Sequence, residues 1–129
     1  MMVAAVTVLT SSIPVKVACI GDSITYGACI EDRENDSYPS VLQGLLGNDY
    51  EVRNFGFSAR TMLDKGDYPY MNEKMYQEVK EYLPDIITIM LGTNDSKPHN
   101  WAGKDGFEKD CKKMISELQN LPSHPRIYI

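Results

Sequence analysis

The sequence lacks several features that would identify a class of protein directly. Its three cysteines are an odd number and lie far apart, so they form neither a disulfide framework nor a metal-binding signature. No hydrophobic run is long enough to span a bilayer, which argues against a membrane partner. The chain has 13 Lys and Arg against 18 Asp and Glu, and a net charge of -5 argues against nucleic acid as a partner. Neither glycine-rich phosphate-binding pattern, G-x-G-x-x-G or G-x-x-x-x-G-K-[ST], occurs, which counts against a nucleotide-binding domain.

What is present is typical of one globular domain. The 129 residues, of which 43% are hydrophobic, are enough for a single hydrophobic core. We assign residues 13–129 to this domain and residues 1–12 to an N-terminal extension or the remnant of a signal peptide, although the positive charge of a signal sequence is missing. The compartment stays open between cytoplasmic and secreted. Cys19 and Cys111 fall at apolar positions and are expected in the core.

Strand-like and helix-like patterns alternate along the chain. Four apolar runs, at 15–20, 50–55, 85–91 and 126–129, predict buried parallel strands. Helices are predicted between them: at 38–46, with one face of five apolar residues that we expect to be buried, at 75–83 and at 107–118. This alternation indicates right-handed crossovers and an α/β fold in which helices cover both faces of a parallel sheet.

Two of the predicted strands end in residues that can carry out chemistry. Gly21-Asp22-Ser23 follows the first strand, and Gly92-Thr93-Asn94-Asp95 follows the third. Ligands bind at the carboxyl ends of strands in open α/β sheets, so a serine nucleophile and an amide donor are expected near one another. Taken alone, Ser23 is also compatible with capping a turn, and Asn94 with ending a strand in an Asx-turn.

These two blocks, together with Asn54-Phe55-Gly56-Phe57-Ser58-Ala59, resemble the first three motif blocks of the SGNH (GDSL-type) hydrolase family, in the right order. The residues of these blocks are most similar to those of the sialate O-acetylesterase-like and acylhydrolase branch of the family. The resemblance implies a three-layer α/β/α, flavodoxin-like fold with strand order 2-1-3-4-5. Because only four strands are found, we expect the domain to be truncated after the fourth.

The resemblance also implies roles for individual residues. Ser23 would be the nucleophile, and the oxyanion donors would be the Asn94 side chain and the backbone N–H groups of Ala59 and Ser23. Ala59 stands where the family has a glycine. Asp22 and Asp95 are expected to hold loops by accepting backbone hydrogen bonds. The supporting residues are Gly21, Asp22, Asn54, Gly56, Gly92 and Asp95.

The last block of the family, an Asp-x-x-His that bears the catalytic base, is absent from the sequence. His99 follows the Asn94 block and is a weak candidate to replace it, whereas His124 precedes the fourth strand and is expected at the wrong end of the sheet. Tyr26, His99 and Trp101 are candidates for the substrate side of the site, and Trp101 either stacks on a sugar ring or packs on the domain.

The resulting hypothesis is a serine ester hydrolase, or part of one, acting on a small acylated substrate such as an acetylated sugar. The resemblance implies no metal and no organic cofactor. A non-catalytic remnant of the fold that binds a ligand or partner is the alternative, because a nucleophile without a base leaves only a residual rate. The uncovered edge of the fourth strand also predicts self-association.

Overall fold

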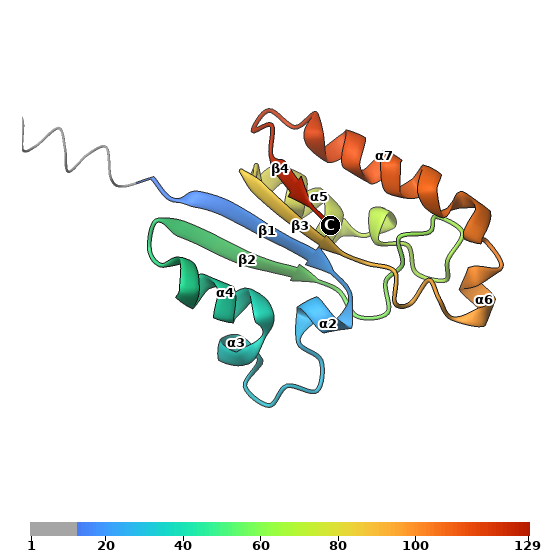
Figure 1. Cartoon of the computed structure of the whole chain (residues 1–129), viewed down its shortest axis with the longest axis horizontal. Helices are drawn as coiled ribbons and strands as arrows, with labels where there is room; N and C mark the ends of the chain where they lie inside the picture. Colours follow the sequence, from blue (N-terminus) through green and yellow to red (C-terminus); the bar gives the residue numbers. More distant parts are fainter. Residues whose placement is uncertain (1–12) are drawn as a thin grey trace, which may run out of the picture.

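A computed structural model describes residues 13–129, which form a four-stranded parallel sheet in the order β2-β1-β3-β4 (Figure 1). The strands are β1 (Val15–Gly21), β2 (Tyr50–Gly56), β3 (Ile86–Met90) and β4 (Arg126–Tyr128). The predicted strands and their order are confirmed, with boundaries that differ by one residue. The N-terminal extension proposed for residues 1–12 lies outside the described residues.

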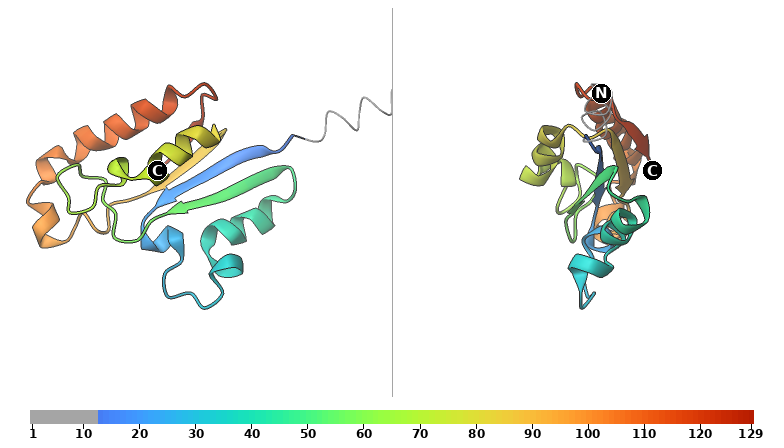
Figure 2. Two further views of the ribbon diagram at one scale, coloured as in Figure 1. Left: turned by 180° about the vertical axis from the view of Figure 1, so that it is seen from behind. Right: turned by 90° about the vertical axis from the view of Figure 1, so that its left-hand side faces the viewer.

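Three longer helices connect the strands, as predicted. They are α4 (Tyr38–Leu46), α5 (Lys74–Tyr82) and α7 (Phe107–Gln119). The short elements are α2 (Ser23–Tyr26), α3 (Arg33–Asp36), α6 (Pro98–Trp101) and the 3₁₀ turns η1 (Tyr70–Asn72) and η2 (Lys104–Gly106). In the part of the chain that the structure describes, no helix has the length and apolar character needed to cross a membrane. Helix α4 lies on one face of the sheet, and α5 and α7 lie on the other (Figure 2).

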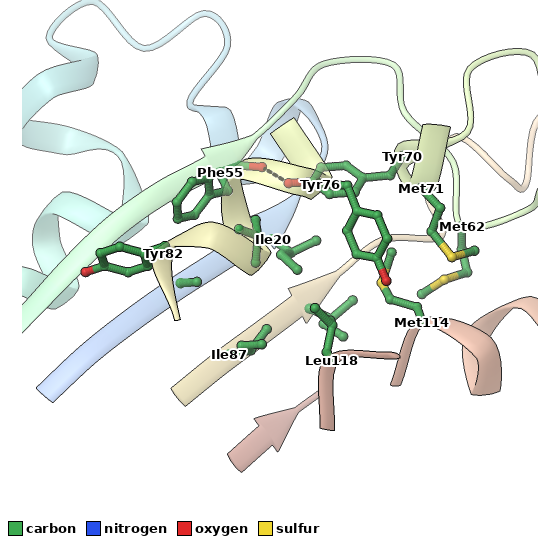
Figure 3. Close-up of a cluster of buried hydrophobic side chains, with 13 residues drawn as sticks. Ile20, Phe55, Met62, Tyr70, Met71, Tyr76, Tyr82, Ile87, Met114 and Leu118 are labelled. Carbon is green, nitrogen blue, oxygen red and sulfur yellow. Dashed lines mark hydrogen bonds between the residues drawn. The ribbon is translucent and has the colours of Figure 1, made fainter. Parts of the chain in front are cut away.

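The core lies between the sheet and the pair α5 and α7 (Figure 3). Ile20 and Ile87 from the strands are completely buried against Met114 and Leu118 of α7. The hydroxyl of Tyr70 reaches across this core and donates a 2.6 Å hydrogen bond to the backbone carbonyl at the end of β2. Strand residues that alternate in the sequence thus present one apolar set to this face.

The prediction of a buried apolar face on α4 is wrong for part of that face. Val41 is 48% exposed and Leu45 is 80% exposed. The reason is that α4 contacts β2 through Gln43, whose side chain donates to the Tyr50 carbonyl (2.9 Å) and accepts from the Val52 N–H (2.7 Å). Val41 and Leu45 instead line an open apolar hollow of about 540 Å³ that no described element covers.

The cysteines are all free thiols. Cys19 is buried and Cys111 is half-buried against the core, as expected, whereas Cys29 is exposed. Burial raises the pKa of the Cys19 thiol. The described residues therefore contain no disulfide that would constrain the loops of the site.

Candidate active site

Ser23 is the first residue of α2 and directly follows β1 and Asp22. The carboxylate of Asp22 accepts the N–H of Ile24 (2.9 Å), so it caps this four-residue helix. The Ser23 backbone N–H, being in the first helical turn, has no acceptor within the helix. The side chain of Ser23 is half-buried at the carboxyl end of the sheet. The hydroxyl and the free backbone N–H of Ser23 therefore lie close together at this end of the sheet.

The second motif block holds α2 in place through hydrogen bonds. The amide of Asn54 donates to the carbonyls of Thr25 (2.9 Å) and Tyr26 (3.3 Å), and its oxygen accepts the Gly56 N–H (2.8 Å). At Gly56 a Cβ atom would overlap the backbone of Tyr26. Helix α2 is therefore in backbone contact with the end of β2, and only glycine fits between them.

Ala59 adopts the left-handed conformation, with φ of 68°. This conformation is the one that favours glycine, and it costs a residue with a Cβ roughly 1–2 kcal/mol. The backbone hydrogen bonds found among residues 13–129 leave the Ala59 N–H without an acceptor. At the position where the family has a glycine, the backbone thus adopts a conformation that favours glycine although alanine occupies it.

Asn94 is buried and lies beside the second block. Its side-chain amide donates to the Arg60 carbonyl (3.0 Å), while its own backbone carbonyl accepts from the amide of Asn100 (2.8 Å). A side-chain amide has two N–H groups, and the hydrogen bond to Arg60 uses one of them. Because Arg60 follows Ala59, this hydrogen bond joins the loop of Asn94 to the loop that carries the other predicted oxyanion donor.

Asp95 holds the continuation of that loop. It is completely buried, and its carboxylate accepts the N–H groups of Met62 (3.0 Å) and Leu63 (2.7 Å). Gly92 lies between Asp95 and the end of β3. Both aspartates of the motifs, Asp22 and Asp95, accept backbone hydrogen bonds in the structure, which is the geometry that the sequence led us to expect.

Arg60 fixes the second block from the other side, a role that sequence reasoning missed. Its guanidinium lies 3.6 Å from the centre of the Phe57 ring, donates to the Ser58 carbonyl (3.0 Å) and forms an ion pair with Glu73 (3.0 Å). The sequence places Arg60 directly after the second motif block but does not indicate its partner, because Glu73 is distant along the chain. The contact between them exists only once α5 packs against this loop.

The two histidines are not brought to Ser23. His99 lies on α6, exposed, with a ring nitrogen 3.0 Å from the Asp67 carboxylate. That hydrogen bond, together with one from Asn100, lowers the pKa of Asp67. Both Figure 1 and Figure 2 show α6 at one end of the molecule, away from α2. His124 precedes β4 and therefore lies at the amino end of the sheet, as predicted.

The two aromatic candidates have different surroundings. Trp101 packs edge-on against Phe107, with ring centres 6.1 Å apart, and is partly exposed. Tyr26 is 39% exposed at the end of α2, and the guanidinium of Arg33 lies 3.7 Å from its ring centre. Tyr26 is thus the aromatic candidate that lies on the same short helix as Ser23. Across residues 13–129, no three His, Cys, Asp or Glu side chains are grouped so that they hold a metal.

A serine at the end of a parallel strand, with amide donors from two neighbouring loops, is the arrangement of an α/β serine hydrolase. Residues 19–129 match the model of the GDSL-like lipase/acylhydrolase family, and the chain belongs to this family. The resemblance inferred from the three motif blocks is thereby confirmed.

Individual relatives agree with this assignment. An acetylxylan esterase from Xylanibacter ruminicola is 52% identical over 105 residues, which are 81% of this chain and 22% of that protein. A multidomain esterase from Ruminococcus flavefaciens is 30% identical over 146 aligned positions, covering 89% of this chain and 18% of that protein. The chain thus spans about a fifth of the length of these curated relatives.

A solved structure supports the fold. The crystal structure of a carbohydrate acetylesterase family member from Sinorhizobium meliloti superposes with a TM-score of 0.67 at 28% identity, over 88% of this chain and 60% of that one. The expected SGNH-type α/β architecture is confirmed by this similarity and by the observed strand order.

Proposed function

We propose that this chain carries the nucleophile and oxyanion donors of an esterase that removes small acyl groups, and that its substrate is an acetylated sugar. The observation that carries the proposal is that Ser23 and Asn94 follow the ends of the neighbouring parallel strands β1 and β3, and that the Asn94 amide bonds the Arg60 carbonyl, next to the free Ala59 N–H. The sugar and acetyl parts rest on the names of the relatives, an acetylxylan esterase and a carbohydrate acetylesterase family member.

In this reaction the Ser23 hydroxyl attacks the ester carbonyl, and the carbonyl oxygen becomes negatively charged. The N–H groups of Ser23 and Ala59 and the second amide N–H of Asn94 then donate to that oxygen. The alcohol leaves with a proton, and water releases the acid from the acyl-enzyme. A base must take the serine proton in the first step and return it to the alcohol. The 129 residues contain no Asp-x-x-His to supply it.

The test is turnover of p-nitrophenyl acetate and of acetylated xylo-oligosaccharides by the chain and by its Ser23→Ala variant. Because these 129 residues lack that base, we expect only a residual turnover by the chain, which is lost in Ser23→Ala and falls roughly 10²- to 10³-fold in Asn94→Ala. Ser96→Ala is the matched control, because its hydroxyl only donates to the Thr93 carbonyl nearby. Equal rates for the chain and Ser23→Ala would contradict the proposal.

The second candidate function is ligand binding without turnover. The absence of an Asp-x-x-His from the sequence favours it. Calorimetry with acetylated xylo-oligosaccharides separates the two functions, because a binding protein gives a saturable heat with no release of acetate. Release of acetate that depends on Ser23 would contradict this alternative.

We also propose that the chain associates with itself through the outer edge of β4. Tyr128 is 56% exposed and Ile129 is 77% exposed, and no strand among residues 13–129 pairs with that edge. Unpaired strand edges are templates for another chain. Sedimentation velocity should show a concentration-dependent dimer that Tyr128→Lys weakens, whereas a strictly monomeric chain would contradict the proposal.

A further inference from the structure

Ala59 lies in a tight turn formed by Phe57, Ser58, Ala59 and Arg60. The N–H of Arg60 faces the Phe57 carbonyl at 3.4 Å, which is long for a backbone hydrogen bond. Of the four residues only Ala59 has a positive φ, and a positive φ at the third residue is the mark of a type II turn. Glycine is favoured at that position because it has no Cβ. The turn is thus closed by a weak backbone contact and carries an unfavourable residue.

The competing conformation for such a sequence is a type I turn, in which the third residue has a negative φ. Between the two types, ψ of the second residue and φ of the third differ by about 150–170°, so the peptide that joins these residues is turned over. In this chain that peptide joins Ser58 to Ala59 and carries the Ala59 N–H, one of the proposed oxyanion donors. A change of turn type would therefore point this N–H away from its direction in the structure.

The side chain of Arg60 contacts the two residues at the start of the turn. Its Nη1 donates a 3.0 Å hydrogen bond to the Ser58 carbonyl, and its guanidinium lies 3.6 Å from the centre of the Phe57 ring. Among residues 13–129, no other hydrogen bond reaches the Ser58–Ala59 peptide. The C=O and the N–H of a trans peptide point in opposite directions, so a donor that holds the Ser58 carbonyl also sets the direction of the Ala59 N–H.

The guanidinium that makes this hydrogen bond is itself fixed. Its Nε and Nη2 donate to one carboxylate oxygen of Glu73, at 3.1 and 3.0 Å, which leaves Nη1 for the Ser58 carbonyl. The side chains of Arg60 and Glu73 are only 18% and 26% exposed. The backbone carbonyl of Arg60 accepts from the Asn94 amide at 3.0 Å. Arg60 thus contacts the peptide of one proposed oxyanion donor through its side chain and the second donor through its backbone.

We propose that Arg60 is a positioning residue, whose hydrogen bond to the Ser58 carbonyl holds the Ser58–Ala59 peptide in the type II orientation and so directs the Ala59 N–H. The role of that N–H rests on the proposed function, whereas the conformation of the turn does not. The cost of a positive φ to alanine is similar in size to the contribution of one hydrogen bond from a charged donor. This single contact is therefore sufficient to decide between the two turn types.

The test compares Arg60→Lys with Arg53→Lys. Lysine keeps a positive charge opposite Glu73, but its single ammonium group cannot bond that carboxylate and the Ser58 carbonyl in the geometry of the planar guanidinium. Arg53 is the matched control, because it also lies over an aromatic ring, that of Tyr82, and also pairs with a glutamate. Both changes leave the net charge as it is. Glu73→Gln is a second variant, since it keeps Arg60 but removes the charge that fixes the guanidinium.

The orientation of the peptide is measured by NMR. The nuclear Overhauser effect between the Ser58 Hα and the Ala59 amide proton is strong in a type II turn and weak in a type I turn, because ψ of Ser58 differs between them. We expect this effect to weaken in Arg60→Lys and Glu73→Gln and to stay unchanged in Arg53→Lys. The residual turnover of p-nitrophenyl acetate should fall about tenfold in Arg60→Lys.

A second comparison repeats Arg60→Lys in a chain that carries Ala59→Gly. Glycine adopts a positive φ without the cost that alanine has, so the turn should no longer depend on Arg60. The Overhauser effect should then remain strong after Arg60→Lys, and turnover should fall by about twofold or less. A role of Arg60 limited to packing would give the same loss with either residue at position 59.

Two outcomes would overturn the inference. One is an Overhauser effect that is unchanged in both Arg60→Lys and Glu73→Gln, and the other is an equal loss with alanine and with glycine at position 59. The Overhauser effect is measured without turnover, which keeps this result apart from the proposed function. A chain whose turn responds as expected but that has no Ser23-dependent turnover contradicts the proposed function and not the role of Arg60 in the turn.

Discussion

On the face of the sheet that α5 and α7 cover, Met114 and Leu118 are completely buried, whereas on the α4 face Val41 and Leu45 are 48% and 80% exposed. All three helices have apolar residues at helical spacing. The packed face receives side chains from two helices and from η1, whereas no residue of α4 belongs to that buried cluster. Spacing therefore shows which side of a helix is apolar, and the neighbouring elements decide whether that side is buried.

The same difference extends into the candidate site. The loop that carries Ala59 is fixed against the packed face through buried Asp95 and the ion pair of Arg60 with Glu73. Helix α2, which carries Ser23, is held by Asn54 and Gly56. Ile24, the residue after Ser23 in this helix, is 52% exposed. Ala59 and Asn94, two of the proposed oxyanion donors, thus belong to the better packed region, and Ser23, the proposed nucleophile, lies at its boundary with the less packed one.

The largest expected difference comes from shortening a leucine on each face. Leu118→Ala removes a completely buried side chain from the core, and we expect it to lower the free energy of unfolding by about 2–5 kcal/mol. Leu45→Ala removes a side chain that is 80% exposed, and the change should stay within about 0.5 kcal/mol. Urea unfolding of both variants measures the difference. Similar losses would mean that the α4 face is covered in solution.

A second pair of variants compares one hydroxyl on each face. Burial raises the pKa of Tyr70 well above its ordinary value, so its hydroxyl stays protonated and donates to the buried Phe55 carbonyl. Tyr70→Phe leaves that carbonyl without its donor and should cost about 1–3 kcal/mol. Tyr38→Phe breaks a longer contact of 3.2 Å with the Thr88 hydroxyl in a half-buried place, and should cost about 0.5–1 kcal/mol. Thermal unfolding of the two variants in one buffer gives the comparison, and the reverse order would contradict it.

Much of the fold could be predicted from the sequence, because the strands and long helices are continuous apolar patterns. The run from Val15 to Ile20 forms β1 with one more residue, and Gly47 and Pro84 follow the ends of α4 and α5 as expected. The carboxyl ends of β1 and β3 bring Ser23 and Asn94 to one edge, since parallel neighbours end together. Local patterns and the rules of parallel sheets were sufficient for these features.

Other features depend on contacts between distant residues and could not be predicted. The exposure of Val41 follows from which elements flank α4, and no pattern within the helix reports on that. The left-handed backbone at Ala59 is imposed by a loop that Asp95 and Arg60 hold from elsewhere in the chain. The pairing of His99 with Asp67 likewise joins two loops. Such contacts become visible only when the packing is known.

A smaller effect concerns an ion pair that joins the two helices of the packed face. Glu117 of α7 accepts from Lys80 of α5 (2.9 Å) and from the Tyr76 hydroxyl (3.1 Å), and the hydrogen bond from Lys80 lowers the pKa of Glu117. Because the folded-state pKa lies below the unfolded value, the carboxylate stabilises the fold above the unfolded pKa. This contribution is lost as the pH falls through the folded pKa.

We therefore expect Glu117→Gln to be less stable than the unmodified chain by about 0.5 kcal/mol near pH 7 and equally stable near pH 3. Urea unfolding across this pH range measures the difference. Glu108→Gln is the control, because the pair of Glu108 with Lys112 lies on the exposed side of α7 and its loss should not be measurable. A difference for Glu117→Gln that persists at the acid end would mean that the charge is not its cause.

The smallest expected effect on stability, and the sharpest test of the open face, is a charge placed in the α4 hollow. Val41→Lys puts an ammonium group at a position that is 48% exposed, where it reaches water, so the free energy of unfolding should change by no more than about 0.5 kcal/mol. At Val79, a valine of α5 that is completely buried, the same change to lysine would bury an unpaired charge and should prevent folding.

Binding of a hydrophobic dye distinguishes a filled hollow from an open one, because Val41→Lys should lower dye fluorescence only if the native chain exposes this apolar surface. If Val41→Lys unfolds the chain as the Val79 change does, the α4 face is as closely packed as its opposite, and the difference between the two faces does not exist in solution.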